Sequence, residues 1–192
     1  MAETRSSMLP LGTSLPAIVL PNAVDGVAVD VRALAEGKRG TLVMFFCNHC
    51  PFVLHIRHEV VVVAHEALDQ GLAVVAINSN DIHTYPQDGP GPMARLAREE
   101  GWRFPFLFDE TQTIARELHA ACTPEFFVFD AKGQLAYRGQ FDDSRPSNGK
   151  PVTGRDLRAA VKAVAEGRMP SLDQKPSVGC GIKWRRAATG EA

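Results

Sequence analysis

Apolar residues follow two different spacings in the first half of this chain, and each spacing predicts a kind of element. Two almost wholly apolar runs, 41–46 and 72–77, are typical of strands that are buried on both faces of a sheet. Between them, apolar residues recur at helical spacing from Phe52 to Leu68, and Gly71 follows, which predicts one long amphipathic helix. The core therefore starts as strand, helix and strand.

The rest of the chain continues this alternation and then ends it with a hairpin. Two short apolar runs near the N-terminus predict a β-hairpin, and two later runs separated by residues 130–133 predict an antiparallel pair. We expect strands at 17–20, 27–31, 106–108, 126–129 and 135–137, and helices at 93–100, 111–119 and 154–166. This order predicts an α/β fold with a central mixed β-sheet flanked by helices.

The composition is that of one ordinary globular domain. Of the 192 residues, 45% are hydrophobic and 22% are charged, so the chain can bury one sizeable core. No repeat or low-complexity segment divides it. We expect a single domain over residues 1–192, with its core at about 9–167 and a C-terminal tail at 168–192 that is interrupted by prolines and glycines.

Charge and proline placement exclude two classes of partner. The formal net charge of −1 gives no electrostatic case for binding nucleic acid or an anionic membrane surface. Pro10, Gly12, Pro16 and Pro21 interrupt every N-terminal apolar stretch that could form a signal-peptide core or a membrane span. We therefore expect a cytoplasmic protein with neither kind of partner.

The candidate chemistry lies in the hexapeptide Cys47-Asn48-His49-Cys50-Pro51-Phe52, between the first buried strand and the long helix. A strand that delivers a cysteine to the first turn of a helix exposes its sulfur to the positive helix end, which favours thiolate over thiol. Pro51 suits the first helical position, so we expect Cys50 to be the N-cap. A helix terminus lowers a thiol pKa by roughly 0.2 to 1.5 from its usual value of about 8.5. Cys50 is therefore the expected nucleophile.

Three segments make the chain resemble a known family. The hexapeptide, the stretch Cys-Thr-Pro-Glu-Phe-Phe at 122–127 and the stretch Ser-Val-Gly-Cys-Gly-Ile-Lys-Trp at 177–184 resemble the thioredoxin-like superfamily. The resemblance spans about 9–184 and is to the branch related to alkyl hydroperoxide reductase and thiol-specific antioxidant proteins, in a subgroup described as peroxiredoxin-like or probable thiol-disulfide isomerase. It implies a thioredoxin-like fold. Matching the strand at 42–46 without gaps places the family's first active-site cysteine on Cys50 and its second on Val53.

The resemblance also implies roles for residues around Cys50. Cys47 is the first candidate for the resolving cysteine and Cys180, on the tail, is the second. Cys122 is a further candidate, although a packing role in a buried strand explains it equally well. Thr123-Pro124 matches a cis-proline turn that faces the active site, and the Thr123 backbone would pair with an extended substrate segment.

Two polar residues are further candidates for lining the substrate cleft. His49, between the two cysteines, would lower the pKa of Cys50 when protonated, or else is a solvated loop residue. Asn80 leaves the end of a parallel strand, on the side where open sheets bind ligands, or else caps the next helix.

Two departures from better known relatives narrow the expected activity. The buried acid that assists the resolving cysteine of thioredoxin would fall on Met44, so that proton acceptor is missing. The peroxidatic cysteine of peroxiredoxins would fall on Val53, and Thr123 occupies the place where their arginine is expected. We therefore do not expect efficient peroxide reduction by the standard peroxiredoxin site.

The sequence thus predicts an enzyme, a thiol-disulfide oxidoreductase. Cys50 attacks a protein or small-molecule disulfide, Cys47 or else Cys180 resolves the mixed disulfide, and an external thiol reductant restores the dithiol; no cofactor and no resident metal are expected. One alternative is a thiol peroxidase or peroxide sensor of the same fold. The second is a non-catalytic metal-binding or partner-binding module, in which the Cys-x-His-Cys cluster and His83 supply ligands.

Overall fold

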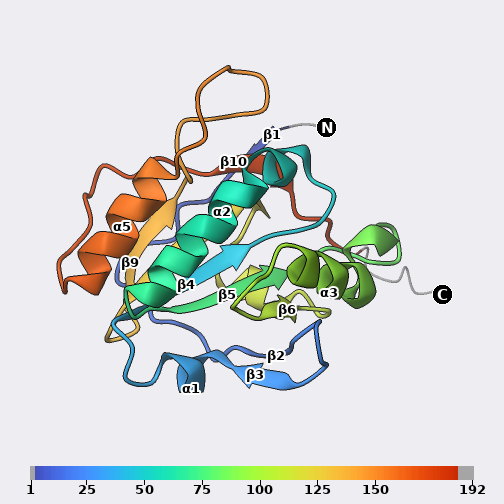
Figure 1. The fold of residues 1–192 in the computed structure, drawn as a ribbon, viewed down its shortest axis with the longest axis horizontal. Helices are drawn as coiled ribbons and strands as arrows, with labels where there is room; N and C mark the ends of the chain where they lie inside the picture. Colours follow the sequence, from blue (N-terminus) through green and yellow to red (C-terminus); the bar gives the residue numbers. More distant parts are fainter. Residues whose placement is uncertain (1–2, 186–192) are drawn as a thin grey trace, which may run out of the picture.

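The structure, a computed structural model, describes residues 3–185 and contains a five-stranded mixed sheet at its centre (Figure 1). The strand order is β6-β5-β4-β8-β9. The pairs β4–β5 and β5–β6 are parallel, whereas β4–β8 and β8–β9 are antiparallel. The strands are β4 (Gly40–Phe45), β5 (Ala73–Asn78), β6 (Phe106–Phe108), β8 (Glu125–Asp130) and β9 (Leu135–Gly139). The predicted α/β architecture is confirmed.

Every residue of β4 and β5 is buried, because helices cover both faces of the sheet. Leu42 and Met44 of β4 belong to the hydrophobic cluster beneath the three longest helices. Val43 and Phe45 point to the other face and pack with the two short helices and the N-terminal segment. Successive side chains of a strand therefore enter the hydrophobic clusters on opposite faces of the sheet. Because both faces are buried, nearly every residue of β4 and β5 is apolar.

The helices follow the predicted order, with shifted ends. On one face lie α2 (Pro51–Asp69), α3 (Pro90–Glu99) and α5 (Arg155–Ala165), as Figure 1 shows. The other face carries α1 (Val31–Ala35), which the sequence analysis did not predict, and α4 (Thr113–Glu117), which is shorter than expected. A 3₁₀ turn, η1 (Pro86–Asp88), precedes α3.

The predicted N-terminal hairpin is present. It is formed by β2 (Val19–Pro21) and β3 (Ala28–Asp30), which pair antiparallel. Asp30 then caps α1 by accepting hydrogen bonds from the backbone N–H groups of Arg32 and Ala33.

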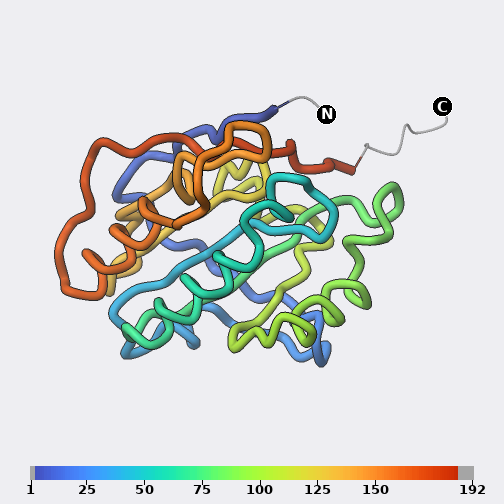
Figure 2. The backbone as a smooth tube through the Cα atoms, turned by 45° about the horizontal axis from the view of Figure 1, so that its top comes forward, coloured from blue at the N-terminus to red at the C-terminus, as the bar shows by residue number. Residues whose placement is uncertain are grey.

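The C-terminal segment, expected to be an irregular tail, contains a strand. In it, β10 (Val178–Gly181) lies between β1 (Glu3–Arg5) and β7 (Cys122–Thr123) and pairs antiparallel with both. Figure 2 shows the segments that contain β1 (blue) and β10 (red) side by side along one edge of the molecule. Glycine at 179 allows this contact, because a Cβ there would collide with the carbonyl oxygen of Thr123.

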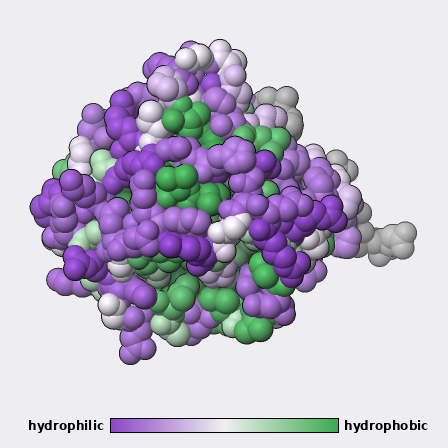
Figure 3. Space-filling model, viewed as in Figure 1, coloured by the Kyte–Doolittle hydropathy of each residue, from purple (hydrophilic) through white to green (hydrophobic). Residues whose placement is uncertain are grey.

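The surface in Figure 3 is mainly hydrophilic, with apolar patches over α2 and beside the β2–β3 hairpin. Large apolar side chains exposed in these places are Leu54 and Val62 on α2, and Val19 and Val27 at the hairpin. Among residues 3–185, no helix is long and apolar enough to cross a membrane.

Candidate active site

Cys50 lies at the start of α2, directly after the loop that leaves β4. It is the N-cap residue of the helix, and Pro51 occupies the first helical position, as predicted. Cys47 and Cys50 are both buried with no exposed surface. The helix therefore directs its free N–H groups towards a sulfur that is shielded from water.

Thr123 joins the cysteines into one cluster. Its hydroxyl oxygen lies 3.2 Å from the Cys47 Sγ, and its carbonyl oxygen lies 3.2 Å from the Cys50 Sγ. The Thr123–Pro124 peptide bond is cis, as the sequence analysis expected. Across the strand pair, Thr123 is the direct partner of Cys180. Three cysteines from two segments of the chain, the loop before α2 and β10, therefore meet around one threonine.

Hydrogen bonding lowers the pKa of Cys50 to about 5. The largest cause is the hydrogen bond from the Cys47 thiol, which outweighs the opposing effect of burial. The side chain and the backbone N–H of Cys180 and the backbone N–H of Val53, in the first turn of α2, lower it further. Cys50 is thus a thiolate at neutral pH.

Burial has the opposite effect on the other two sulfurs of the cluster. It raises the pKa of Cys47 well above the usual value, and the hydrogen bond to Cys50 and the charge of Asp88 add to this effect. Burial also raises the pKa of Cys180 to about 12, again helped by Cys50. Both residues therefore remain thiols and donate to the Cys50 thiolate. The Thr123 hydroxyl in turn hydrogen-bonds the Cys47 sulfur.

Cys122 is buried on β7, but its hydrogen-bond contacts point away from the cluster. Its Sγ lies 3.8 Å from the carbonyl oxygen of Pro124 and 3.9 Å from a carboxylate oxygen of Glu125. Burial raises the pKa of the Cys122 thiol strongly, and it raises the pKa of Glu125 to about 7. The Glu125 carboxylate also accepts hydrogen bonds from the backbone N–H groups of Ala121 and Cys122.

The sequence analysis missed one buried acid, Asp88. Its carboxylate, on η1, accepts from the backbone N–H of Asn48, from the Asn80 amide and from His49 Nδ1, at 2.8, 2.8 and 2.6 Å. Asn80, a predicted cleft residue, also accepts from the backbone N–H of Lys183. The only sequence signal for Asp88 was an acidic residue before a Gly-Pro turn, in a loop that resembled a surface connection.

The same residues form a possible set of metal ligands. One ligand atom from each of Cys47, His49 and Asp88 lies within 4.8 Å of the others, the one such group found among residues 3–185. Both oxygens of Asp88 already accept hydrogen bonds from protein donors, so a metal would have to displace them. His83, which the metal alternative required, lies outside this group.

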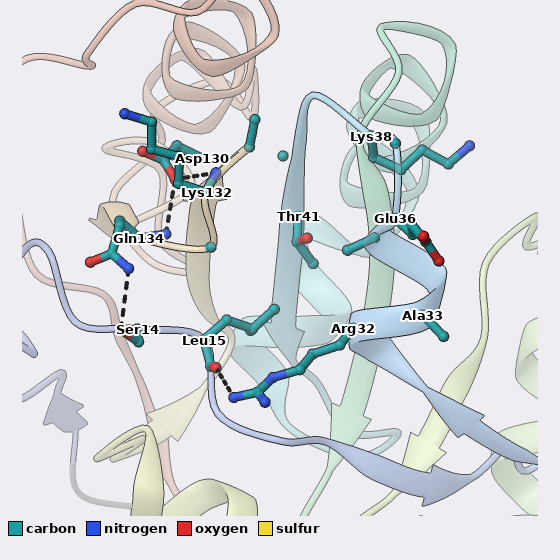
Figure 4. Close-up of a pocket in the computed structure, with 15 residues that line it drawn as sticks. Ser14, Leu15, Arg32, Ala33, Glu36, Lys38, Thr41, Asp130, Lys132 and Gln134 are labelled. Carbon is teal, nitrogen blue, oxygen red and sulfur yellow. Dashed lines mark hydrogen bonds between the residues drawn. The ribbon is translucent and has the colours of Figure 1, made fainter.

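The edge of Thr123 that was expected to pair with a substrate is covered by β10. Pro124 borders a narrow cleft of about 20 Å³ that is also lined by Phe52, His55 and Val178. A much larger cavity, of about 730 Å³, lies between α1 and the 130–134 turn (Figure 4). It adjoins Gly40 and Thr41 at the start of β4, whereas Cys47 follows the end of that strand, so it is remote from the cysteines.

Comparison with protein families matches residues 10–154 to the family described as Redoxin. The chain belongs to the Redoxin family. This confirms the resemblance to the thioredoxin-like superfamily and its peroxiredoxin-related branch. The fold and the family together support a thiol redox role for this Redoxin protein.

Two solved structures resemble the whole chain. An uncharacterized conserved protein from Geobacillus kaustophilus shares 48% identity over 98% of this chain and 99% of its own, with a TM-score of 0.94. A hypothetical protein from Sinorhizobium meliloti 1021 shares 44% identity over 96% and 100%, with a TM-score of 0.92. A peroxidoxin from Mycobacterium tuberculosis shares the fold at 15% identity, over 80% and 96%, with a TM-score of 0.60. A search of curated proteins found no match.

Proposed function

We propose that this Redoxin protein is a thiol-disulfide oxidoreductase with Cys50 as its nucleophile. The observation that carries the proposal is the position of Cys50, at a helix N-cap between the thiols of Cys47 and Cys180, both of which hydrogen-bond its sulfur. A thiolate held at neutral pH next to a second thiol is the arrangement that disulfide exchange requires.

The reaction proceeds in two exchanges. The Cys50 thiolate attacks one sulfur of a substrate disulfide, so that a mixed disulfide forms and the other substrate sulfur leaves as a thiolate. An internal cysteine then loses its proton and attacks the Cys50 Sγ, which releases the second substrate sulfur and leaves an internal disulfide. Two equivalents of an external thiol reductant return the protein to the dithiol form.

Cys47 and Cys180 both remain candidates for the internal cysteine, with Cys47 first. Each hydrogen-bonds Cys50 in the reduced protein. The Thr123 hydroxyl lowers the pKa of Cys47 and so stabilises the thiolate that the second exchange needs. Lys183 has the corresponding effect on Cys180.

Substrate access depends on β10. For an extended polypeptide to pair with the Thr123 backbone, as the sequence analysis expected, β10 must first leave that edge. Pro124 and His49 would then flank the mixed disulfide, while Asn80 holds Asp88 behind them. We further propose that residues 1–192 form one domain and that it works in the cytoplasm, where such a disulfide cycles rather than persists.

A second candidate function is that of a thiol peroxidase or peroxide sensor. The low pKa of Cys50 favours it, because a thiolate attacks a hydroperoxide to give a sulfenic acid and an alcohol. A neighbouring thiol then condenses with the sulfenic acid, with loss of water, to give the same internal disulfide. Consumption of peroxide that depends on Cys50 and exceeds turnover of disulfides would favour this candidate.

The test is turnover of a small disulfide substrate with an external thiol reductant. Cys50→Ser should abolish turnover, because it removes the nucleophile. Cys47→Ser should accumulate a mixed disulfide between Cys50 and substrate, visible by intact mass. Full activity in Cys50→Ser would refute the proposal, and Cys122→Ser is the matched control because its thiol contacts Glu125 and Pro124 instead.

A further inference from the structure

Asp88 is held beside the cysteine loop, and among residues 3–185 no lysine or arginine forms an ion pair with it. Its side chain is completely buried, and its carboxylate oxygens accept three hydrogen bonds, from Asn48, Asn80 and His49. The Asn78 amide also donates to the Asp88 carbonyl oxygen, at 2.6 Å. The acid is therefore fixed by contacts from β5 and from the loop before α2. Burying a carboxylate costs free energy that these hydrogen bonds only partly offset, and such buried charges are frequent at functional sites.

His49 connects this acid to the cysteines. Because Nδ1 donates to Asp88 at 2.6 Å, the neutral ring carries its proton on Nδ1, and Nε2 is left as an acceptor. Nε2 is buried and has no hydrogen-bond partner among the described residues. Tyr85 stacks on the ring, with centroids 4.9 Å apart and planes 10° apart, and so fixes its orientation. The result is an oriented base with a free lone pair.

The second exchange needs such a base. Cys47 must lose its proton to attack Cys50, but its side chain is buried with no exposed surface, so bulk water cannot accept this proton. The position of the usual buried acid is Met44, which cannot accept a proton. A ring nitrogen of His49, an oxygen of Asp88 and the Cys47 sulfur lie within 4.8 Å of one another, so a small shift of the loop would bring the ring within hydrogen-bond distance of the sulfur.

The other charged and titratable groups around His49 do not offer an alternative acceptor. Tyr85 stacks on the His49 ring, and the Lys183 ammonium lies 5.7 Å from the centroid of the Tyr85 ring. Cys50 carries the substrate at this stage, and Cys180 is itself a thiol with a raised pKa. Both carboxylate oxygens of Asp88 accept hydrogen bonds from Asn48, His49 and Asn80, and neither forms a hydrogen bond with Cys47.

We propose that His49 is the proton acceptor for Cys47 in the resolving step and that Asp88 is the positioning residue that orients its ring. The inference rests on the proposed function and assigns Cys47 as the resolving cysteine. The proton passes from the Cys47 Sγ to His49 Nε2, the Cys47–Cys50 bond forms, and the bond from Cys50 to the substrate sulfur breaks. The substrate leaves as a thiolate, which takes the proton back from the imidazolium. Asp88 stabilises the imidazolium while it exists.

Single-turnover reaction with dithiobis(nitrobenzoate) separates the two exchanges, since each releases one coloured thionitrobenzoate. All variants carry Cys180→Ser, so that only Cys47 can resolve the mixed disulfide. In His49→Ala the first release should be unchanged, whereas the second should slow at least tenfold at neutral pH. Added imidazole should restore the second release, which a purely structural defect would not allow. Asp88→Asn should slow the second release and respond less to imidazole, because the ring is still present.

The outcomes distinguish this inference from the proposed function. A second release in His49→Ala within twofold of the parent rate would overturn the inference while leaving Cys50 as nucleophile. Absence of the first release in the parent protein would instead refute the proposed function. His83→Gln is the matched control, because His83 is an exposed histidine of the following loop whose backbone, and not its ring, contacts Asp81. If His49→Ala does not fold, His49→Gln replaces it, with the same two criteria for the second release.

Discussion

Cys180 pairs directly with Thr123, so that a strand from the C-terminal segment occupies the edge beside the cis proline. Its backbone N–H and its thiol both lower the pKa of Cys50. The sequence analysis expected an extended substrate segment to pair with the Thr123 backbone at this edge, where β10 lies instead. In the structure, Cys180 of the same chain therefore contacts the proposed nucleophile, Cys50.

The low pKa of Cys50 should depend mainly on Cys47. In the reduced protein, the ultraviolet absorbance of the thiolate should titrate with a midpoint near pH 5. Cys47→Ala removes the largest stabilising hydrogen bond, so the midpoint should rise by at least one pH unit, about 1.4 kcal/mol. Cys47→Ser retains a donor and should raise it less. An unchanged midpoint in Cys47→Ala would show that the Cys47 hydrogen bond does not set the pKa of Cys50.

Gly179→Ala should detach β10 from β7. The added Cβ collides with the Thr123 carbonyl, which is backbone and cannot move aside, and we expect a loss of stability of about 1–3 kcal/mol. Cys50 should then react faster with iodoacetamide, since β10 no longer covers it. Gly91→Ala is the matched control, because a Cβ at that glycine meets open space. Equal alkylation rates in the two variants would show that β10 does not restrict access.

Glu125 should make the protein less stable at alkaline pH. Burial raises its pKa to about 7 from the 4.5 of an exposed glutamate, so the folded state binds this proton more tightly than the unfolded state does. The stabilisation is complete below pH 4.5 and is lost as pH rises through 7, a difference of about 3 kcal/mol. Glu125→Gln should therefore exceed the parent in free energy of unfolding at pH 8 but not at pH 4.

Urea unfolding at the two pH values measures this effect. Glu117→Gln, a substitution of an exposed glutamate on α4, is the control and should leave the pH dependence unchanged. If the free energy of unfolding fell between pH 4 and pH 8 as much in Glu125→Gln as in the parent protein, the assignment to Glu125 would be wrong.

Local signals correctly predicted the position of Cys50 at the start of α2 and the two strands on either side of that helix in the sequence. Pro51 after a cysteine and before an amphipathic run was enough to place the N-cap, and the apolar runs were enough to place β4 and β5. The cis bond before Pro124 followed from the resemblance to a family and not from the residues alone. These features are encoded within a few neighbouring residues.

Features that depend on distant contacts were missed. Two of the four residues of β10 are glycines, which have low strand propensity, and the strand exists because β1 and β7 lie on either side of it. Asp88 lies in a loop rich in proline and glycine, and the donors that satisfy its buried carboxylate come from two other segments, the loop before α2 and the loop after β5. No pattern within either segment could have indicated these partners.

The most direct test of the account is a mass-spectrometric disulfide map after one equivalent of a mild oxidant. We predict a single bridge between Cys50 and Cys47, with Cys122 and Cys180 left as thiols. A bridge from Cys50 to Cys180 would retain the nucleophile but would contradict the role of His49. If Cys50 stayed a free thiol or was converted to sulfinic acid without any bridge, the dithiol mechanism would be wrong.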